Sequence, residues 1–442
     1  MTCLPRIALG TVQPEADHRL IVWGLISALE RLGIKVQSFS SQAHFAGHDA
    51  SKSITGQRQR HVDSWLMSPN TCREIFWHGA QSSDLAIVEG NFSTPSAGAP
   101  SLGGRLDTLC SWLDLPQLAV IDVTKLDSCR LAPRPDNVDG ILLDRVSDSV
   151  HAQQLKLTFE TFWKVPVVGY LNELNEVREQ VSSISQDTKP TRSLFQKIGD
   201  RVCSQLDFNK LLRIACRRAF PSIKPVLFQR TDATPRLKVA FAFDEAFHCY
   251  FPDTLDLLEA HGAFLQDFSP LHSDRLPIGT ELVYFGCGQA ERFAEALACN
   301  HCMKEALRRH VRNGGRVYAE GSGLAYLMQH INMPDGQRLS MSGLLPLEAS
   351  YNPPSAAIRP VSVKLVRDNW LGRTSSKLRG YLNPNWLVSG TGATVNELVG
   401  RHQVVGSRLN VDFAAQPEFL RSFFDPVPLP ASAKTLCAPL SY

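Results

Sequence analysis

The first part of the chain alternates short apolar runs with segments of helical periodicity. Residues 20–32 carry apolar side chains at helical spacing, and Gly33 follows them as a typical helix stop. Uninterrupted apolar strands of this kind predict a parallel sheet covered by helices on both faces. The runs that we interpret as strands are residues 6–9, 35–39, 85–88, 118–121, 140–143 and 165–169.

A polar segment separates this pattern from a second one of the same kind. Residues 182–235 are rich in polar residues and contain one basic helical stretch, residues 206–220, so we interpret them as a connector with a packing helix. The fold class that we predict is α/β, with one parallel-sheet domain over residues 1–181 and another over residues 236–442. Apolar strands of the second domain are predicted at residues 237–241, 282–285 and 317–319.

The composition is that of an ordinary folded protein. Of 442 residues, 43% are hydrophobic and 20% are charged, which excludes a disordered chain. The 46 basic and 43 acidic residues nearly balance, so the charge gives no reason to expect nucleic acid as a partner. No apolar run approaches the roughly 20 residues that span a bilayer, and the first residues show no signal peptide. We expect a cytoplasmic protein that has no membrane partner.

Eleven cysteines, scattered along the chain, suit reduced thiols. One local cluster, Cys299, His301 and Cys302, places three soft donors within a short stretch, where a metal or a redox pair could be held. A zinc site needs a fourth ligand, and the sequence shows no second pair of this kind. We therefore favour plain thiols at a helix start and predict no metal site.

The most distinctive segment is residues 314–327, which read Gly-Gly-Arg-Val-Tyr-Ala-Glu-Gly-Ser-Gly-Leu-Ala-Tyr-Leu. A buried strand, a glycine-rich turn and a helix follow one another here, which is the arrangement of a nucleophile elbow. Such a turn lifts one side chain above the edge of a sheet. In this chain the residue at the turn is Gly321, which has no side chain.

This segment resembles the glutaminase elbow of the cobyrinic acid a,c-diamide synthase family, which reads Tyr-Ala-Glu-Cys-Gly-Gly-Leu-Met-Tyr-Leu. In register, the nucleophilic cysteine of the family falls on Gly321. Further matches follow in the right order over nearly the whole chain. They are residues 24–29, residues 56–67, Val88-Glu89-Gly90, residues 241–247, Tyr250-Phe251-Pro252, residues 268–271 and residues 414–418.

The resemblance implies a dethiobiotin-synthetase-like N-terminal domain that binds nucleotide and a class I glutamine amidotransferase-like C-terminal domain. Active members use ATP to activate carboxylates on a tetrapyrrole rim, and they amidate them with ammonia from glutamine. The family thus implies ATP and magnesium as cofactors and a tetrapyrrole as the ligand.

The residues of the ATP loop depart from the family's pattern. A phosphate cradle needs N–H groups freed by glycines, a lysine, and a Ser/Thr for magnesium. The expected Gly-Lys-Thr-Thr falls at about residues 17–20, which are Asp-His-Arg-Leu, while Pro14 lacks an N–H and Glu15 adds negative charge. Arg19 could bind one phosphate but cannot replace the cradle. We predict a degenerate P-loop that binds neither ATP nor magnesium.

The glutaminase residues depart as well. Glutamine hydrolysis needs a thiolate, a histidine base and an oxyanion hole. The family's Ser-Tyr-x-His-x-His-Phe falls on residues 407–413, where Asn410 and Asp412 replace both histidines. Ser322 follows the turn, and Cys287 lies in the turn that shapes the oxyanion side in the family, so both are outside candidates for a nucleophile. We predict no catalytic residue at this site.

A group of polar residues falls in the part of the first domain that faces the tetrapyrrole in relatives. Arginine and histidine suit propionate and acetate side chains, and the alternative is that these are solvated loop residues. The candidate ligand-binding residues are His44, His48, Arg58, Arg60, His61, Asp63 and Glu89.

These observations favour a non-catalytic pseudoenzyme that binds a tetrapyrrole or a protein partner, as a homodimer or in complex with an active paralogue. Two alternatives stay open. One is a divergent active amidase of a cobalamin- or sirohaem-type pathway, which would be a glutamine-dependent ligase. The other is a scaffold in a metal-cofactor or sulfur-metabolism complex, without a small ligand.

Overall fold

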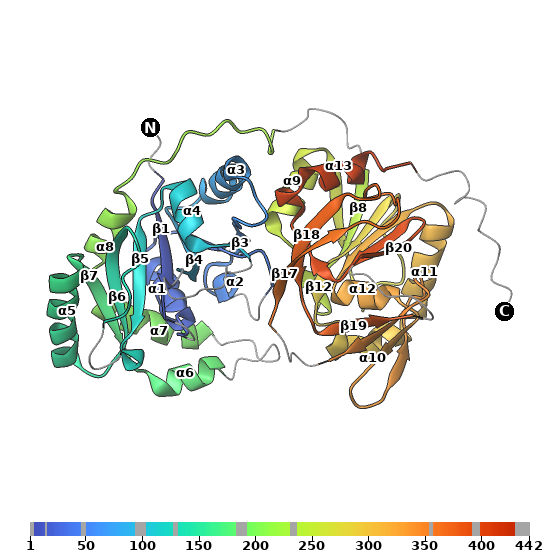
Figure 1. Ribbon diagram of the computed structural model, residues 1–442. Helices are drawn as coiled ribbons and strands as arrows, with labels where there is room; N and C mark the ends of the chain where they lie inside the picture. Colours follow the sequence, from blue (N-terminus) through green and yellow to red (C-terminus); the bar gives the residue numbers. More distant parts are fainter. Residues whose placement is uncertain are drawn as a thin grey trace. The chain divides into compact units, whose positions relative to one another are not determined.

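The computed structural model of the chain describes residues 4–13, 16–45, 50–92, 103–126, 131–182, 192–229, 237–352, 357–390 and 398–428. The chain forms two compact units, Met1–Gln42 with Ala46–Pro225, and Ala43–Phe45 with Val226–Tyr442. Both units are built on largely parallel sheets with helices on their faces (Figure 1), so the predicted α/β fold class is confirmed. None of the helices in the described ranges has the length and apolar character needed to cross a lipid bilayer.

The first unit contains a seven-stranded sheet in the order β3-β2-β4-β1-β5-β6-β7. All of its strand pairs are parallel. In an open sheet of this kind, ligands bind at the carboxyl ends of the strands where the strand order reverses, which here is around β1 and β4. The predicted strands of this half are all present. The bounds are β1 (Arg6–Thr11), β2 (Val36–Ser40), β3 (Arg60–His61), β4 (Leu85–Asn91), β5 (Gln117–Asp122), β6 (Val138–Val146) and β7 (Val167–Asn172).

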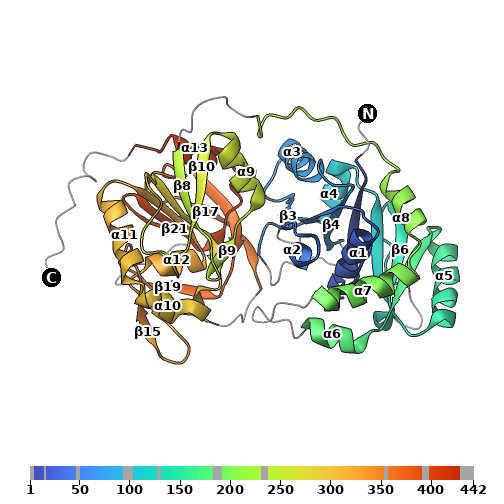
Figure 2. The ribbon, with the colours of Figure 1, turned by 180° about the vertical axis from the view of Figure 1, so that it is seen from behind.

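Helices cover both faces of this sheet. One face shares a core with α1 (Arg19–Arg31), α7 (Arg192–Gln205) and α8 (Phe208–Ala215), and Figure 2 shows α1 and α7 side by side. On the other face lies α4 (Leu106–Leu113), where a Cβ on Gly10 would lie 2.7 Å from Leu106 Cδ2. The other helices described in this unit are α2 (Ala50–Thr55), α3 (Pro69–Ala80), α5 (Ser149–Trp163) and α6 (Asn175–Ser182), with the 3-10 turn η1 (Val123–Lys125).

Helix α7 is absent from the elements that the sequence predicts. Its residues Ile198 and Val202 are buried in the core beside α1. The two helices approach closely at Gly24, where a Cβ would lie 2.7 Å from a methyl carbon of each of these residues. Residues 192–205 therefore pack within the first unit.

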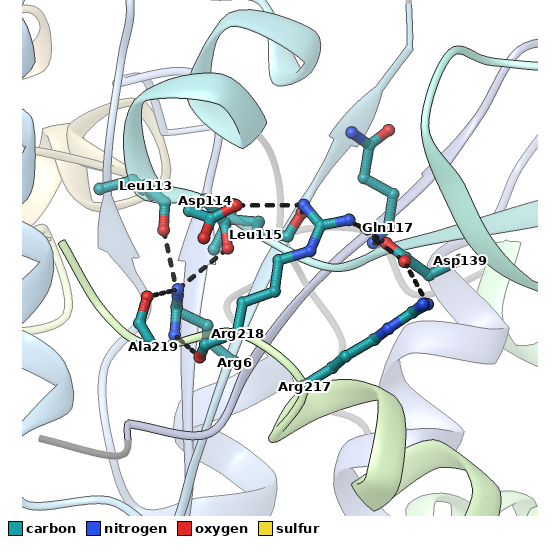
Figure 3. A network of polar contacts seen from close by, with 9 residues as sticks. All are labelled: Arg6, Leu113, Asp114, Leu115, Gln117, Asp139, Arg217, Arg218 and Ala219. Carbon is teal, nitrogen blue, oxygen red and sulfur yellow. Dashed lines mark hydrogen bonds and ion pairs between the residues drawn. The ribbon is translucent and has the colours of Figure 1, made fainter. Parts of the chain in front are cut away.

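A network of arginines explains why the predicted helix 206–220 ends at Ala215 (Figure 3). Arg6, fully buried at the start of β1, donates to the carbonyl oxygens of Leu113 and Ala219, each at 3.0 Å. Arg218 pairs with Asp139 of β6 at 2.8 Å. These contacts hold residues 218 and 219 against β1 and β6, so these two residues do not continue helix α8.

The second unit contains a six-stranded sheet in the order β10-β8-β11-β13-β21-β20. Its strand pairs are parallel except the last, in which β20 runs antiparallel to β21. The three strands predicted for this half are β8, β11 and β13. The bounds are β8 (Leu237–Ala242), β10 (Ala263–Phe268), β11 (Leu282–Phe285), β13 (Arg316–Glu320), β20 (Leu398–Arg401) and β21 (Val404–Ser407).

Helices and smaller sheets complete the described part of this unit. The helices are α9 (Pro252–Ala260), α10 (Ala294–Cys299), α11 (His301–Arg312), α12 (Ser322–Leu327) and α13 (Pro417–Phe424), with the 3-10 turns η2 (Ala290–Phe293) and η3 (Phe413–Ala415). A two-stranded sheet joins β9 (Phe247–Cys249) and β12 (Cys287–Gly288), and a three-stranded one joins β17 (Arg359–Lys364), β18 (Lys377–Leu382) and β22 (Leu409–Asn410). A four-stranded sheet joins β14 (His330–Asn332), β15 (Arg338–Ser340), β16 (Glu348–Tyr351) and β19 (Trp386–Ser389).

Candidate functional site

The elbow that the sequence predicts is present in the second unit. Strand β13 leads into Gly321, and α12 begins at the next residue. Gly321 has φ 49° and ψ −112°, a conformation that favours glycine because a side chain would strain it. Its N–H donates to the carbonyl oxygen of Ser407 at 2.9 Å. The turn keeps the sharp geometry of a nucleophile elbow, although its apex carries no side chain.

A thiol from another strand lies beside this apex. A Cβ built on Gly321 would lie 2.9 Å from Sγ of Cys287, which begins β12. Asn410, in the register position of the family's histidine base, donates an Nδ2 hydrogen to the same sulfur at 2.7 Å. The structure thus brings together Gly321, Cys287 and Asn410, three residues that are far apart in sequence.

The surroundings of Cys287 disfavour its reactive form. Burial raises the pKa of the Cys287 thiol well above its usual value, and the nearby Glu320 carboxyl raises it further. Hydrogen bonds from Asn410 and from the backbone N–H of Ser322 oppose the shift without cancelling it. Because the thiolate is the nucleophile, a thiol that stays protonated at neutral pH is weakly reactive. The amide of Asn410 cannot remove its proton.

Ser322 and Asp412 are two further positions that the sequence analysis names at the glutaminase site. Ser322 is buried at the first position of α12, one residue past the apex, and its Oγ has no hydrogen-bond partner among the described residues. Asp412 accepts from the N–H of Ala414 at 3.0 Å and from Oγ1 of Thr254 at 3.2 Å. It therefore caps the turn η3, and this position has a structural role.

The residue directly before the elbow carries a buried carboxyl group. Glu320, the last residue of β13, is 1% exposed. It accepts hydrogen bonds from the hydroxyl of Tyr284 at 3.1 Å and from the N–H of Val411 at 3.2 Å. Burial raises the pKa of Glu320 to about 8, although these bonds lower it. The group is mostly protonated at neutral pH.

In the first unit, the loop after β1 places a carboxylate at the start of α1. Oδ1 of Asp17 accepts from the backbone N–H of Arg19 at 3.0 Å and from its Nε at 2.8 Å, while Oδ2 pairs with Nη2 at 2.7 Å. In this register the Ser/Thr position that would hold magnesium falls on Arg19, a cationic side chain that offers no oxygen ligand. Pro14 and Glu15 lie outside the described residues. A carboxylate of the chain itself thus lies at the helix N-terminus where a phosphate would bind.

Charged residues that the sequence analysis missed gather at the ends of β5 and β6. Asp122 and Asp144 lie opposite each other on the neighbouring strands β5 and β6. Asp122 forms an ion pair with Arg145 at 3.3 Å, and Asp144 forms one with Arg178 at 2.5 Å. Burial raises the pKa of Asp144 to about 6, although Arg178 opposes the shift. Gln13 bonds to the backbone of Asp122 in both directions, at 2.9 and 2.7 Å. The only signal in the sequence was an aspartate at the end of each apolar run.

Two of the candidate ligand-binding residues of the first unit make internal contacts. Asp63 is fully buried, and its Oδ1 accepts from the N–H groups of Trp65 at 2.8 Å and Leu66 at 3.1 Å. Glu89 accepts a hydrogen bond from the side chain of Gln59. Asp63 therefore stabilises the turn that follows it. The carboxylate of Glu89 is hydrogen-bonded to the Gln59 side chain.

Three basic candidates, Arg58, Arg60 and His61, lie at or just before β3, the edge strand of the sheet. Both arginines are partly exposed and His61 is buried. The stem of Arg60 packs on α3, because a Cβ on Gly79 would lie 2.4 Å from Arg60 Cδ. The neighbouring backbone is fixed where Gln37 donates to the carbonyl oxygen of Arg58 at 3.0 Å. Arg58 and Arg60 thus lie at this edge of the sheet.

The two remaining candidates do not belong to this group. His44 lies in Ala43–Phe45, which groups with the second unit, and its ring centroid lies 5.2 Å from that of Tyr381. Burial lowers the pKa of His44 to about 4, so the ring is neutral at physiological pH. His48 lies outside the described residues.

The cysteine cluster of the second unit is at the surface. Cys299, His301 and Cys302 are all exposed. Within the described part of the chain, their ligand atoms do not form a group of three close enough to share one metal ion.

The strand orders and the elbow define a two-unit α/β protein whose second unit has the fold of a glutamine amidotransferase. The family model of the CobB/CobQ-like glutamine amidotransferase domain matches residues 238–381. The chain is 27% identical to the cobyrinate a,c-diamide synthase of Dehalococcoides mccartyi (strain CBDB1), over 95% of this chain and 97% of that protein. It is 26% identical to the protein of the same name from Syntrophotalea carbinolica, over 96% of this chain and 99% of that protein. The match to a solved structure of a glutamine amidotransferase covers 42% of this chain and 98% of that chain, with 15% identity and a TM-score of 0.31. Over nearly its whole length the chain therefore resembles the cobyrinate a,c-diamide synthase family, and its second unit matches the CobB/CobQ-like glutamine amidotransferase domain.

Proposed function

We propose that this protein is a non-catalytic member of its family that keeps the two-unit body as a binding module for a carboxylate-bearing tetrapyrrole. The observation that carries the proposal is the elbow. Its apex is Gly321, the adjacent thiol of Cys287 is held protonated, and Asn410 stands in the place of the base. Covalent glutamine hydrolysis needs a nucleophile activated by a base, and both are absent from the family positions.

The first unit supports the same proposal independently. Asp17 occupies the helix N-terminus that would bind phosphate, and Arg19, at the position of the magnesium-binding Ser/Thr, offers no oxygen to magnesium. A bound nucleotide would have to displace the ion pair between Asp17 and Arg19 and bring its own negative charge next to Asp17. ATP and magnesium are therefore not part of the proposed function.

The proposed ligand follows from the relatives and from the edge strand β3. The relatives are named for a reaction on cobyrinate, a tetrapyrrole with carboxylate side chains. Guanidinium groups bind carboxylates in a bidentate manner, so Arg58 and Arg60 are the side chains that we propose to hold the rim. A homodimer, or a complex with an active paralogue, would be the setting in which such a module works.

A divergent amidase is the second candidate, because Cys287 places a sulfur next to the apex from which the nucleophile is missing. In that function Cys287 would be a displaced nucleophile. The raised pKa of this thiol and the lack of a base argue against it.

Titration with haem, sirohaem and a corrinoid tests the binding proposal, with absorbance bands and tryptophan fluorescence as readouts. Each charge-assisted contact contributes roughly 1.5–3 kcal/mol, so Arg58→Ala/Arg60→Ala should weaken binding about a hundredfold or more. The matched control is Arg192→Ala/Arg213→Ala, two exposed arginines elsewhere in the first unit, which should bind as the wild type does. If none of the three compounds binds below about 100 μM, a Kd equivalent to about −5.5 kcal/mol, the tetrapyrrole proposal is wrong.

A further inference from the structure

Two exposed cysteines flank a fixed break between two helices of the second unit. Helix α10 ends at Cys299 and α11 begins at His301, because Asn300 between them has a non-helical ψ of 76°. The Asn300 side chain is held at three points. Its Oδ1 accepts from the N–H of Met303 at 3.0 Å, and its Nδ2 donates to the carbonyl oxygens of residues 270 and 273 at 2.9 and 3.0 Å. The break is thus rigid, and both thiols remain at the surface.

The two cysteines have different neighbours. Cys302 is the second residue of the twelve-residue helix α11 and lies at its N-terminal end. Cys299 lies close enough to Lys304 for the two groups to interact electrostatically. The ammonium of Lys304 is anchored beside Cys299, because it donates to the carbonyl oxygen of Ala298 at 2.6 Å. Both cysteines are therefore accessible to a small disulfide in solution, and they lie three residues apart on either side of a fixed break.

We propose that Cys299 and Cys302 form a dithiol site that reacts with a low-molecular-weight disulfide, such as oxidised glutathione, and closes a disulfide across the helix break. One cysteine thiolate attacks a sulfur of the small disulfide, which forms a mixed disulfide and expels one small thiolate. The second cysteine thiolate then attacks the protein sulfur of the mixed disulfide and expels the other small thiolate. The two protons lost by the cysteines end on the two released thiols. The cysteine pair is oxidised by two electrons, and the small disulfide is reduced.

Another exposed cysteine serves as the internal comparison. Cys216 is also at the surface, but it has no second cysteine three residues away. It can form a mixed disulfide, yet it lacks the neighbouring thiol that would resolve it. Cys287 cannot serve as a comparison because burial raises its pKa.

The experiment equilibrates the full chain in buffers of defined ratios of reduced to oxidised glutathione, followed by acid quenching, alkylation of free thiols, and trypsin. Cleavage after Arg292 and Lys304 leaves both cysteines on the peptide 293–304 and Cys216 on another peptide. In the wild type this peptide should lose both free thiols without gaining glutathione. Its oxidised-to-reduced ratio should exceed that of Cys216 about tenfold or more, because a linked thiol has a high effective concentration.

Variants distinguish pairing from plain exposure. Cys299→Ser and Cys302→Ser should each accumulate glutathione on the remaining cysteine, because the resolving thiol is gone. Cys216→Ser should leave closure unchanged. Peptide 293–304 that keeps both thiols free where Cys216 is modified, or that carries as much glutathione in the wild type as in the single variants, would overturn the proposal.

Discussion

Burial changes the protonation of Glu320, the carboxyl group beside the elbow. Its carboxyl group has two hydrogen-bond donors, yet burial still raises its pKa to about 8 from an ordinary value of 4.5. A negative charge at this position would raise the pKa of Cys287 further. The elbow is thus most stable with both groups protonated.

Replacing Glu320 by glutamine should change how stability depends on pH. In the wild type the unfolded chain loses this proton near the ordinary pKa, while the folded protein keeps it until about pH 8. The free energy of unfolding should therefore fall by on the order of a few kcal/mol as the pH rises across this window, and level off above it. Glu320→Gln should remove most of this slope in urea unfolding measured at a series of pH values. The exposed-site control Glu295→Gln should keep the wild-type slope, and a wild-type slope in Glu320→Gln would contradict the assignment.

The sequence predicts the substitutions at the elbow, but it does not predict their surroundings. Gly321, Asn410 and Asp412 align with a family motif in the sequence, and this alignment predicts that the thiol and both histidines are missing. The contact of Cys287 with Gly321 and Asn410 depends on how β12, β13 and β22 come together. That arrangement is a property of tertiary packing, which no local pattern carries.

Among the elements, the loop between β1 and α1 places a carboxylate at the helix N-terminus where a phosphate site is expected. The helix begins directly after the loop, and the N–H of its first residue, Arg19, donates to the carboxylate of Asp17. The local helix signal and the apolar face of α1 are unaffected by this carboxylate, so the sheet and its core remain.

ATP with magnesium should therefore leave the melting temperature unchanged. A ligand that binds only the folded state stabilises it by about 2.7 kcal/mol at a hundredfold excess over its Kd. We expect no such shift in millimolar ATP and magnesium, as measured by differential scanning fluorimetry. A magnesium-dependent rise that disappears in Arg19→Ala would show that the loop still binds nucleotide.

The arginine network of Figure 3 predicts an asymmetry between two arginines that belong to it. Arg6 is fully buried and donates to several carbonyl oxygens, so Arg6→Met leaves these acceptors unpaired and should cost about 3 kcal/mol or more. The side chain of Arg217 is 67% exposed in its pair with Asp139, and Arg217→Met should cost less than about 1 kcal/mol. Urea midpoints measure both changes. Equal shifts in the two variants would mean that the buried network does not hold this segment.

At the scale of the whole molecule, the two α/β halves were predictable because parallel strands read as uninterrupted apolar runs. Helix α7 was not, since it is polar on average and buries only one narrow face against the small residue Gly24. The end of α8 was missed because contacts of Arg6 and Arg218, distant in sequence, stop the helix. Similarly, two of the seven proposed ligand residues, Asp63 and Glu89, make internal contacts that composition could not reveal.

We expect that this protein does not hydrolyse glutamine, and glutamate release tests that expectation most directly. Wild type and Cys287→Ala would be incubated with glutamine in the presence of ATP, magnesium and a tetrapyrrole carboxylate, beside a buffer control. Members of a catalytic triad act as a unit, so with Gly321 and Asn410 in place of thiol and base both proteins should stay at the background rate. Release well above background in the wild type that is abolished by Cys287→Ala would contradict the claim, because Cys287 would then be the nucleophile.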